Sequence, residues 1–140
     1  MNLMTYEEFM QTNDYAQFIA ENPDIGYLKV MAFTAYQAVP IPEVEILITK
    51  QIGENNVLFF RGYTDASGII DNIPLPAPPS GYNPISHQTS NYILYELTAI
   101  RINHEAIKQY TVGMYGGIKT IQYIKMIPNV DLKGVENGNS

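Results

Sequence analysis

The chain has 140 residues, a formal net charge of −6 and no cysteine. A chain of this length ordinarily folds as one domain around one core. Its eight Lys and Arg residues are spaced singly along the sequence, so no basic cluster favours nucleic acid, and we expect no such partner. The lack of cysteine excludes disulfide bonds, a thiolate nucleophile and metal sites built on cysteine.

The first ten residues, MNLMTYEEFM, carry two glutamates where a secretory signal has basic residues before an apolar run. No later stretch approaches the roughly 20 apolar residues of a membrane-spanning helix. We therefore expect a chain that is cytoplasmic at synthesis and has no membrane span. A later association with a spore or cell envelope would need another route of release.

Residues 1–25 are predicted to form an N-terminal helical arm of one or two short helices. Thr5 and Glu8 have the spacing of a capping box, which indicates a helix start. Pro23 disfavours helical geometry in the residue before it and so ends the segment.

The arm carries enough apolar surface to require burial. Helices this short are only marginally stable in water unless they pack on another surface. That surface is either the arm's own domain or another chain, and we favour a protein partner or self-association. The candidate contact residues in the arm are Phe9, Met10, Phe18 and Ile19.

Residues 26–128 change to the alternating pattern of β-strands. Strands are expected at 27–33 and 44–50, where every second residue is apolar and faces a core. The intervening positions, Thr49 among them, are expected to face outward. The residues expected to face the core in these two strands are Leu28, Val30, Ala32, Val44, Ile46 and Ile48.

Five further strands are expected, and the clearest is 92–101, with Ile93, Tyr95, Leu97 and Ala99 on one face. A loop rich in Pro, Ser, Gly and Asn precedes it. The ranges of the other four strands are 57–64, 69–75, 108–115 and 118–127.

The last two of these strands are separated by Gly116 and Gly117 and are expected to form a terminal hairpin. The buried face of the final strand stays open, because two apolar sets alternate along it. One set is Ile124 and Met126, and the other is Ile121, Tyr123 and Ile127. Residues 129–140 have almost no apolar content and are expected to be a disordered tail.

Asp65 and Gly68 are predicted to form a structural turn between two strands. A carboxylate can accept backbone N–H bonds across such a turn, and glycine takes the positive φ that closes it. A weak calcium site on Asp65 and Asp71 is the alternative, although two carboxylates are few for a cation that binds six to eight oxygens. We therefore expect no metal and no cofactor.

Residues 26–50, 62–79 and 92–101 together carry a family resemblance. An opening strand leads to a Pro-containing loop, a T-D-x-x-G turn and a late Y-x-L strand, and this order resembles the carboxypeptidase regulatory-like domain. The resemblance implies an all-β fold, a seven-stranded transthyretin-like or Ig-like β-sandwich, over residues 26–128. One departure is INHEAIKQY after the late strand, where the family has a Gly-aromatic pair.

The segment LPAPP, residues 75–79, adds a narrower similarity. It resembles the N-terminal non-catalytic region of clostridial spore cortex-lytic enzymes and of related small Firmicutes proteins. That similarity implies a structural module in a spore or cell-envelope assembly.

Catalytic arrangements find little support in the sequence. A triad could be written from Ser86, His87 or His104, and Asp71, but no nucleophile elbow surrounds these residues. Two isolated histidines without cysteine do not make a zinc site. We therefore expect that the chain is not an enzyme.

The aromatic composition, with 11 tyrosines and five phenylalanines, favours recognition. Tyr27, Tyr36, Tyr82 and Tyr115 fall in or beside expected loops and outer faces and are the candidate contacts. Two functions follow as hypotheses. The first is a non-catalytic structural or protein-interaction module, and the alternative is a module that binds cell-wall glycan or peptide through loop tyrosines.

Overall fold

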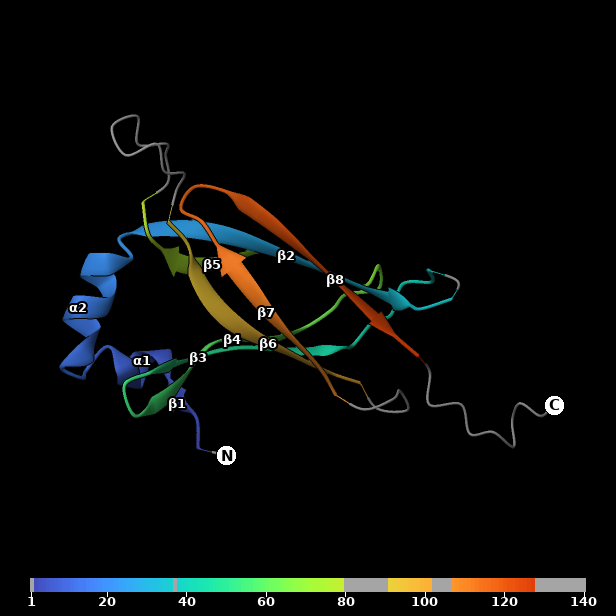
Figure 1. Cartoon of the computed structure of the whole chain (residues 1–140). Coiled ribbons are helices and arrows are strands. Elements are labelled where there is room, and N and C mark those ends of the chain that lie inside the picture. Colours follow the sequence, from blue (N-terminus) through green and yellow to red (C-terminus); the bar gives the residue numbers. More distant parts are fainter. Residues whose placement is uncertain (1, 37, 80–90, 102–106, 128–140) are drawn as a thin grey trace.

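The computed structural model describes residues 2–36, 38–79, 91–101 and 107–127, and these form a mostly β structure of two sheets (Figure 1). A five-stranded sheet has the order β1-β4-β3-β6-β7, and a three-stranded sheet has the order β5-β2-β8. The described part of the chain thus has eight strands rather than seven. In chain order the elements are β1 (Met4–Thr5), α1 (Tyr6–Phe9), α2 (Asp14–Glu21), β2 (Asp24–Thr34), β3 (Glu45–Ile52), β4 (Asn55–Tyr63), β5 (Ile69–Ala77), β6 (Ile93–Ile100), β7 (Lys108–Met114) and β8 (Lys119–Met126).

The core lies between the two sheets and is built from alternate residues of their strands. The burial expected for β2, β3 and β6 is confirmed, because every apolar residue assigned to the core there is buried. Thr49 is an exception to the expected exposure, since it is buried. The register between β3 and β4 shifts beside it, where β4 carries one extra residue, Phe59, whereas the pairing of β3 with β6 continues without a shift through Thr49.

The structure resolves which face of β8 is buried. Ile124 and Met126 are fully buried, whereas Ile121 and Tyr123 are exposed. The expected terminal hairpin is wrong, because β7 and β8 belong to different sheets: β7 pairs with β6, and β8 runs parallel to β2. The segment with Gly116 and Gly117 therefore passes from one sheet to the other.

Strand β5 is longer than expected and continues through Pro74 and Pro76 to Ala77. It lies at the edge of its sheet, where proline is tolerated because its missing N–H leaves no ladder bond unmade. The loop expected to begin at Pro76 therefore begins after the strand ends.

The arm forms part of the sandwich. The capping box is present, with Thr5 Oγ1 accepting from the Glu8 amide at 3.1 Å and Glu8 Oε1 accepting from the Thr5 amide at 2.9 Å. Residues Met4–Thr5 pair in parallel with β4, and the two helices lie at one end of the sandwich (Figure 1).

The aromatic side chains of the arm close this end of the core. Phe9 and Phe18 are buried, with ring centroids 5.4 Å apart, and Phe18 lies 5.6 Å from Phe59 of β4. Phe59 in turn lies 5.1 Å from Tyr95. The arm therefore packs on its own chain, and Phe9 and Phe18 offer no free surface to a partner.

Asp65 and Gly68 form the turn between β4 and β5. Asp65 Oδ1 accepts from the amides of Ser67 and Ile69 at 2.8 and 3.0 Å, and Gly68 has φ +76°. A Cβ at Gly68 would lie against the carbonyl oxygen of Ala32. Both the backbone conformation and the close approach to β2 therefore require glycine here.

Candidate functional site

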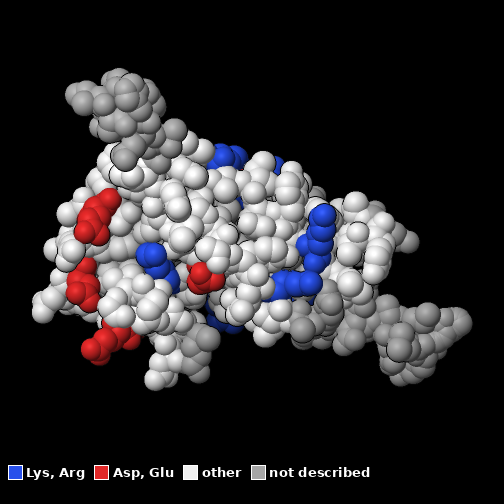
Figure 2. All heavy atoms as spheres, viewed as in Figure 1, with Lys and Arg blue, Asp and Glu red and all other residues white. Residues whose placement is uncertain are grey.

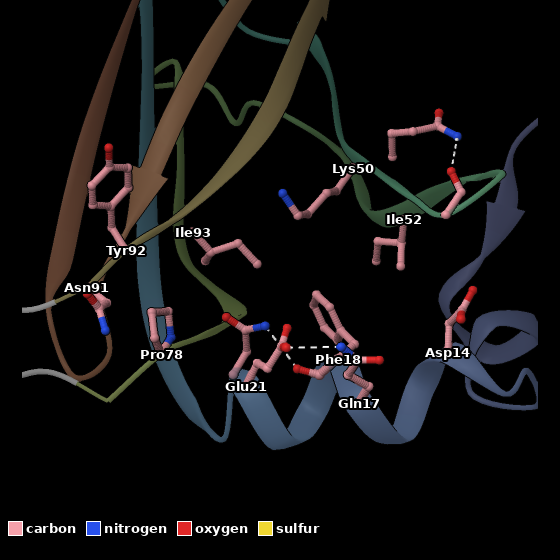
Figure 3. A pocket seen from close by; sticks show the side chains of 13 residues that line it. Asp14, Gln17, Phe18, Glu21, Lys50, Ile52, Pro78, Asn91, Tyr92 and Ile93 are labelled. Atoms are coloured by element: carbon pink, nitrogen blue, oxygen red, sulfur yellow. Dashed lines mark hydrogen bonds between the residues drawn. The ribbon is translucent and has the colours of Figure 1, made fainter.

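A pocket of about 500 Å³ lies between α2, the end of β3 and the start of β6 (Figure 3). We call it the arm pocket. Its volume falls within the range of small-ligand sites in proteins. Segments far apart in sequence supply its walls, so the arm that closes the sandwich also builds the pocket. Its lining includes Asp14, Gln17, Phe18 and Glu21 of α2, Lys50 of β3, Tyr92 just before β6, and Ile93 of β6.

Helix α2 presents one face to the arm pocket. Asp14, Gln17, Phe18 and Glu21 recur at the three- and four-residue spacing that places side chains on one side of a helix. Phe18 is buried in the core, while the two carboxylates are exposed. Gln17 Nε2 donates to Glu21 Oε2 at 3.2 Å. The helix therefore gives the pocket an apolar base and an acidic rim.

Lys50 supplies the opposing charge. Its side chain extends from β3 into the space beside Phe18 and Ile93 (Figure 3). The amine donates to the carbonyl oxygen of Leu94 at 2.8 Å and lies 6.0 Å from the centroid of the Tyr95 ring.

The charge on Lys50 is only partly compensated. Burial lowers the pKa of this amine, and the nearby Glu96 carboxylate opposes that shift. Among the described ion pairs none contains Lys50. A partly desolvated ammonium group with a carbonyl partner, and with no contacting carboxylate in the described part of the chain, is a favourable place for a ligand anion.

Tyrosines lie at the mouth of the arm pocket. Tyr92 is half exposed and lines the pocket, and its ring centroid lies 5.7 Å from that of Tyr115. The predicted contact residue Tyr115 thus borders the site through Tyr92. The sequence predicted neither Tyr92 nor Lys50 as a contact residue, because no local pattern distinguishes either one.

The other predicted contact residues do not meet at this pocket. Tyr27 lies on β2 with its side chain on the outer side of the three-stranded sheet, and Tyr36 is 82% exposed after the far end of β2. Met10 is exposed on the arm, and Ile19 lines a separate, largely apolar hollow of about 400 Å³ beside Pro74. Tyr82 lies outside the described residues.

The residues considered for metal binding or catalysis are engaged elsewhere or are not described. Asp65 is bonded within its turn, and Asp71 Oδ1 lies 2.9 Å from Lys119 Nζ. The hydrogen bond from Lys119 lowers the pKa of Asp71. No group of three or more His, Asp or Glu in the described ranges could hold a metal ion. Ser86, His87 and His104 lie outside those ranges.

No protein-family model matches the sequence, and no curated protein is similar to it. The chain is similar to three solved structures of transthyretin-like fold. The Bacillus anthracis TIE protein is 12% identical, with 75% of this chain and 17% of that chain covered and a TM-score of 0.49. Klebsiella pneumoniae 5-hydroxyisourate hydrolase is 16% identical, with 74% and 97% covered and a TM-score of 0.44. (S)-allantoin synthase is 10% identical, with 77% and 44% covered and a TM-score of 0.44.

The expectation that this chain is not an enzyme is corrected by these neighbours. Two of the solved structures above are named as enzymes, a hydrolase and a synthase. Identities of 16% and 10% concern the fold, and they assign neither reaction to this chain. The chain spans 17% of the TIE protein.

Within the ranges that the structure describes, no helix is both long and apolar enough to cross a membrane.

Proposed function

We propose that this chain is a recognition module that binds a peptide segment of a protein partner in the arm pocket. The observation that carries the proposal is the Lys50 amine, which is partly buried in the pocket and has the Leu94 carbonyl as its acceptor. A peptide carboxylate placed there would replace water as the partner of the ammonium group. Charge-assisted hydrogen bonds of this kind are stronger than neutral ones.

The acidic rim indicates the rest of the ligand. Asp14 and Glu21 stand on the same face of α2, across the pocket from Lys50 (Figure 3). An ammonium or guanidinium group would find its counter-charge there, while the apolar surface of Phe18 and Ile93 would accept a side chain between the two ends. The arrangement therefore favours a short peptide with a basic group at one end and a free carboxylate at the other.

Binding of defined peptides tests the proposal. The probe is a pool of short peptides with lysine at the first position and a free C-terminal carboxylate, titrated while amide resonances lining the pocket are followed. We expect shifts at Ile52 and Ile93, binding at least tenfold weaker after C-terminal amidation, and loss of binding in Lys50→Met. The matched control is Lys125→Met, an exposed lysine outside the pocket, which should bind as the wild type does.

Two results would contradict the proposal that a peptide binds in the arm pocket. One is equal binding of the free and amidated peptides, because the carboxylate would then have no role. The other is unchanged affinity in Lys50→Met, since the ligand would then lie elsewhere on the molecule. A fold control by circular dichroism accompanies both variants.

A glycan is the second candidate, and the contact of Tyr92 with Tyr115 favours it. Paired, partly exposed aromatic rings provide stacking surfaces, with amide and carboxylate groups of the pocket beside them. Retention on purified peptidoglycan that is lost in Tyr92→Ala and kept in Tyr36→Ala would support this candidate over the peptide. Equal retention of both variants would count against it.

Association with a spore or cell-envelope assembly stays a prediction of the sequence resemblance, as does cytoplasmic synthesis. Fractionation of the source cells, with an antibody against this chain, tests both. Recovery of the chain exclusively in the soluble fraction at all growth stages would contradict the envelope assignment.

A further inference from the structure

The outer face of the three-stranded sheet carries a regular arrangement of apolar and lysine side chains. Across the β2–β8 ladder, Tyr27 pairs with Lys119, Lys29 with Ile121, and Phe33 with Lys125. Each lysine thus stands opposite an apolar residue. Between them, Leu28, Val30 and Ala32 of β2 and Ile124 of β8 are buried in the core, so the alternating side chains lie on the side away from it.

This face is both apolar and exposed. Tyr27, Ile121 and Tyr123 are each 40–51% exposed, and the Phe33 and Tyr123 rings have centroids 5.9 Å apart. Contiguous apolar side chains on a sheet surface mark an interaction site more often than scattered ones do.

The same face has an excess of positive charge. It holds three of the eight Lys and Arg residues of a chain whose net charge is −6. Within the described residues, the carboxylate paired with these lysines is Asp71, which bonds Lys119. Lys29 and Lys125 enter no described ion pair.

The arm has the complementary charge. Its exposed side chains include Glu7 and Glu8, with Asp14 and Glu21 at the rim of the arm pocket, and residues 1–28 contain no Lys or Arg. Acidic side chains gather at the arm end of the molecule in the space-filling view (Figure 2). Met10, 37% exposed, adds an apolar side chain among them.

We propose that the outer face of β2 and β8 binds the arm of a second copy of this chain, so that the chains associate head to tail. Opposite charges meet in this arrangement, and Met10 of one copy contacts the exposed aromatic face of the next. A symmetric contact between two outer faces would instead place lysines against lysines, which is unfavourable. A head-to-tail contact uses two different surfaces, and it produces rings or open chains.

The net charge of the molecule disfavours nucleic acid and anionic lipid as partners of this basic face. A chain of net charge −6 is repelled by both as it approaches. A second copy has the same net charge, but it can present the arm, whose residues 1–25 hold five of the 14 Asp and Glu residues and no Lys or Arg.

Two complementary variants test the proposal by sedimentation velocity at low salt. The face variant carries Lys119→Glu and Lys125→Glu, and the arm variant carries Glu7→Lys and Met10→Lys. None of these residues lines the arm pocket, so peptide binding there is scored separately. We expect the wild type to associate as its concentration rises and to dissociate in high salt.

The mixture of the two variants gives the decisive result. Each variant alone should be a monomer, whereas the equimolar mixture should form a one-to-one dimer, because one variant keeps an intact arm and the other an intact face. The dimer also shows that both variants are folded. If either double variant proves unfolded, Lys125→Glu and Met10→Lys alone replace them, with a weaker dimer expected.

Three results would overturn the proposal. The first is a wild type that stays monomeric at all concentrations and salt conditions. The second is continued self-association of either variant alone. The third is a mixture that remains monomeric while the wild type associates, because this would show that the two altered surfaces do not meet each other.

Discussion

The arm end of the sandwich and the outer face of the three-stranded sheet are both rich in aromatic residues, but the aromatic side chains are buried at the arm end and partly exposed on the outer face. At the arm end, Phe9 and Phe18 are buried against Phe59. On the outer face, Tyr27 and Tyr123 are half exposed. The chain therefore closes one apolar surface with its own N-terminal segment and leaves another uncovered.

This difference shows that aromatic composition alone does not identify a contact surface. The apolar residues of the arm suggested docking to a partner, yet Phe9 is fully buried in the core of its own chain. On β8, two sets of apolar residues alternate, and the packing of the two sheets determines which set is buried in the core. Exposure, rather than residue type, separates a docking surface from a closed one.

The largest expected effect is the loss of stability in Phe9→Ala. Removal of a fully buried phenylalanine should lower the free energy of unfolding by about 4 kcal/mol. Tyr123→Ala, on the outer face, is the matched substitution and should change it by less than about 0.5 kcal/mol. Chemical denaturation measures both. Equal losses in the two variants would show that the two surfaces do not differ as described.

Gly68→Val should have the next largest effect, about 3 kcal/mol, because it combines a positive φ with a clash against β2. Gly113→Val is the control, since a Cβ at Gly113 meets its nearest neighbours at 3.6 Å and φ is not positive there. The pair separates damage at the turn beside the three-stranded sheet from a general cost of replacing glycine. Similar melting temperatures for the two variants would contradict the turn geometry.

The pH dependence of stability gives a smaller effect, specific to the arm end. Burial raises the pKa of Tyr6 from 10 to about 12, with Tyr15 adding to the shift, and burial also raises the pKa of Tyr95. A raised tyrosine pKa means that the folded state favours the neutral phenol. The stabilisation is complete below pH 10 and is lost as the pH rises toward 12.

Tyr6→Phe isolates the contribution of the arm to this dependence. Since Tyr6 is only partly buried, solvent screening reduces its share to about 1 kcal/mol. Between pH 9 and pH 12, the free energy of unfolding should fall by about 1 kcal/mol less in the variant than in the wild type. Lys50, whose pKa is lowered, contributes in the opposite direction, but equally in both proteins. If the free energy of unfolding depended on pH identically in the two proteins, burial of the Tyr6 side chain would be contradicted.

Much of the fold could be predicted from local patterns. Alternation placed Leu28, Val30 and Ala32 on the core side because a half-buried strand presents every second residue to the core. The capping box at Thr5 and Glu8 could also be predicted, since its partners lie three residues apart.

The errors arose where distant segments decide the outcome. A Gly-Gly pair between two strands resembles a hairpin turn, but β8 pairs with β2, over 90 residues away. Thr49 is buried although it belongs to the set of β3 residues expected to face outward. These features require knowledge of the neighbouring strand and leave no trace in the local sequence.

The candidate site could not be predicted from the sequence either, because it too depends on segments that are distant along the chain. Lys50 lies on β3 and Tyr92 lies just before β6, and only the docking of α2 beside them creates the pocket. Neither residue has a motif around it. The tyrosines chosen from their position in loops were distributed over the molecule, with Tyr115 alone among the described ones bordering the pocket.

The central claim, that the arm is part of the sandwich while the outer face stays open, is tested most directly by native-state hydrogen exchange. The Asn22 amide bonds the Phe18 carbonyl in the arm, and the Ala32 amide bonds the Gly68 carbonyl in the core, at 3.0 and 2.8 Å. We predict similar protection for the two, because the arm and the core should open together. Exchange of the Asn22 amide at the rate of an unfolded peptide, with Ala32 still protected, would contradict the account.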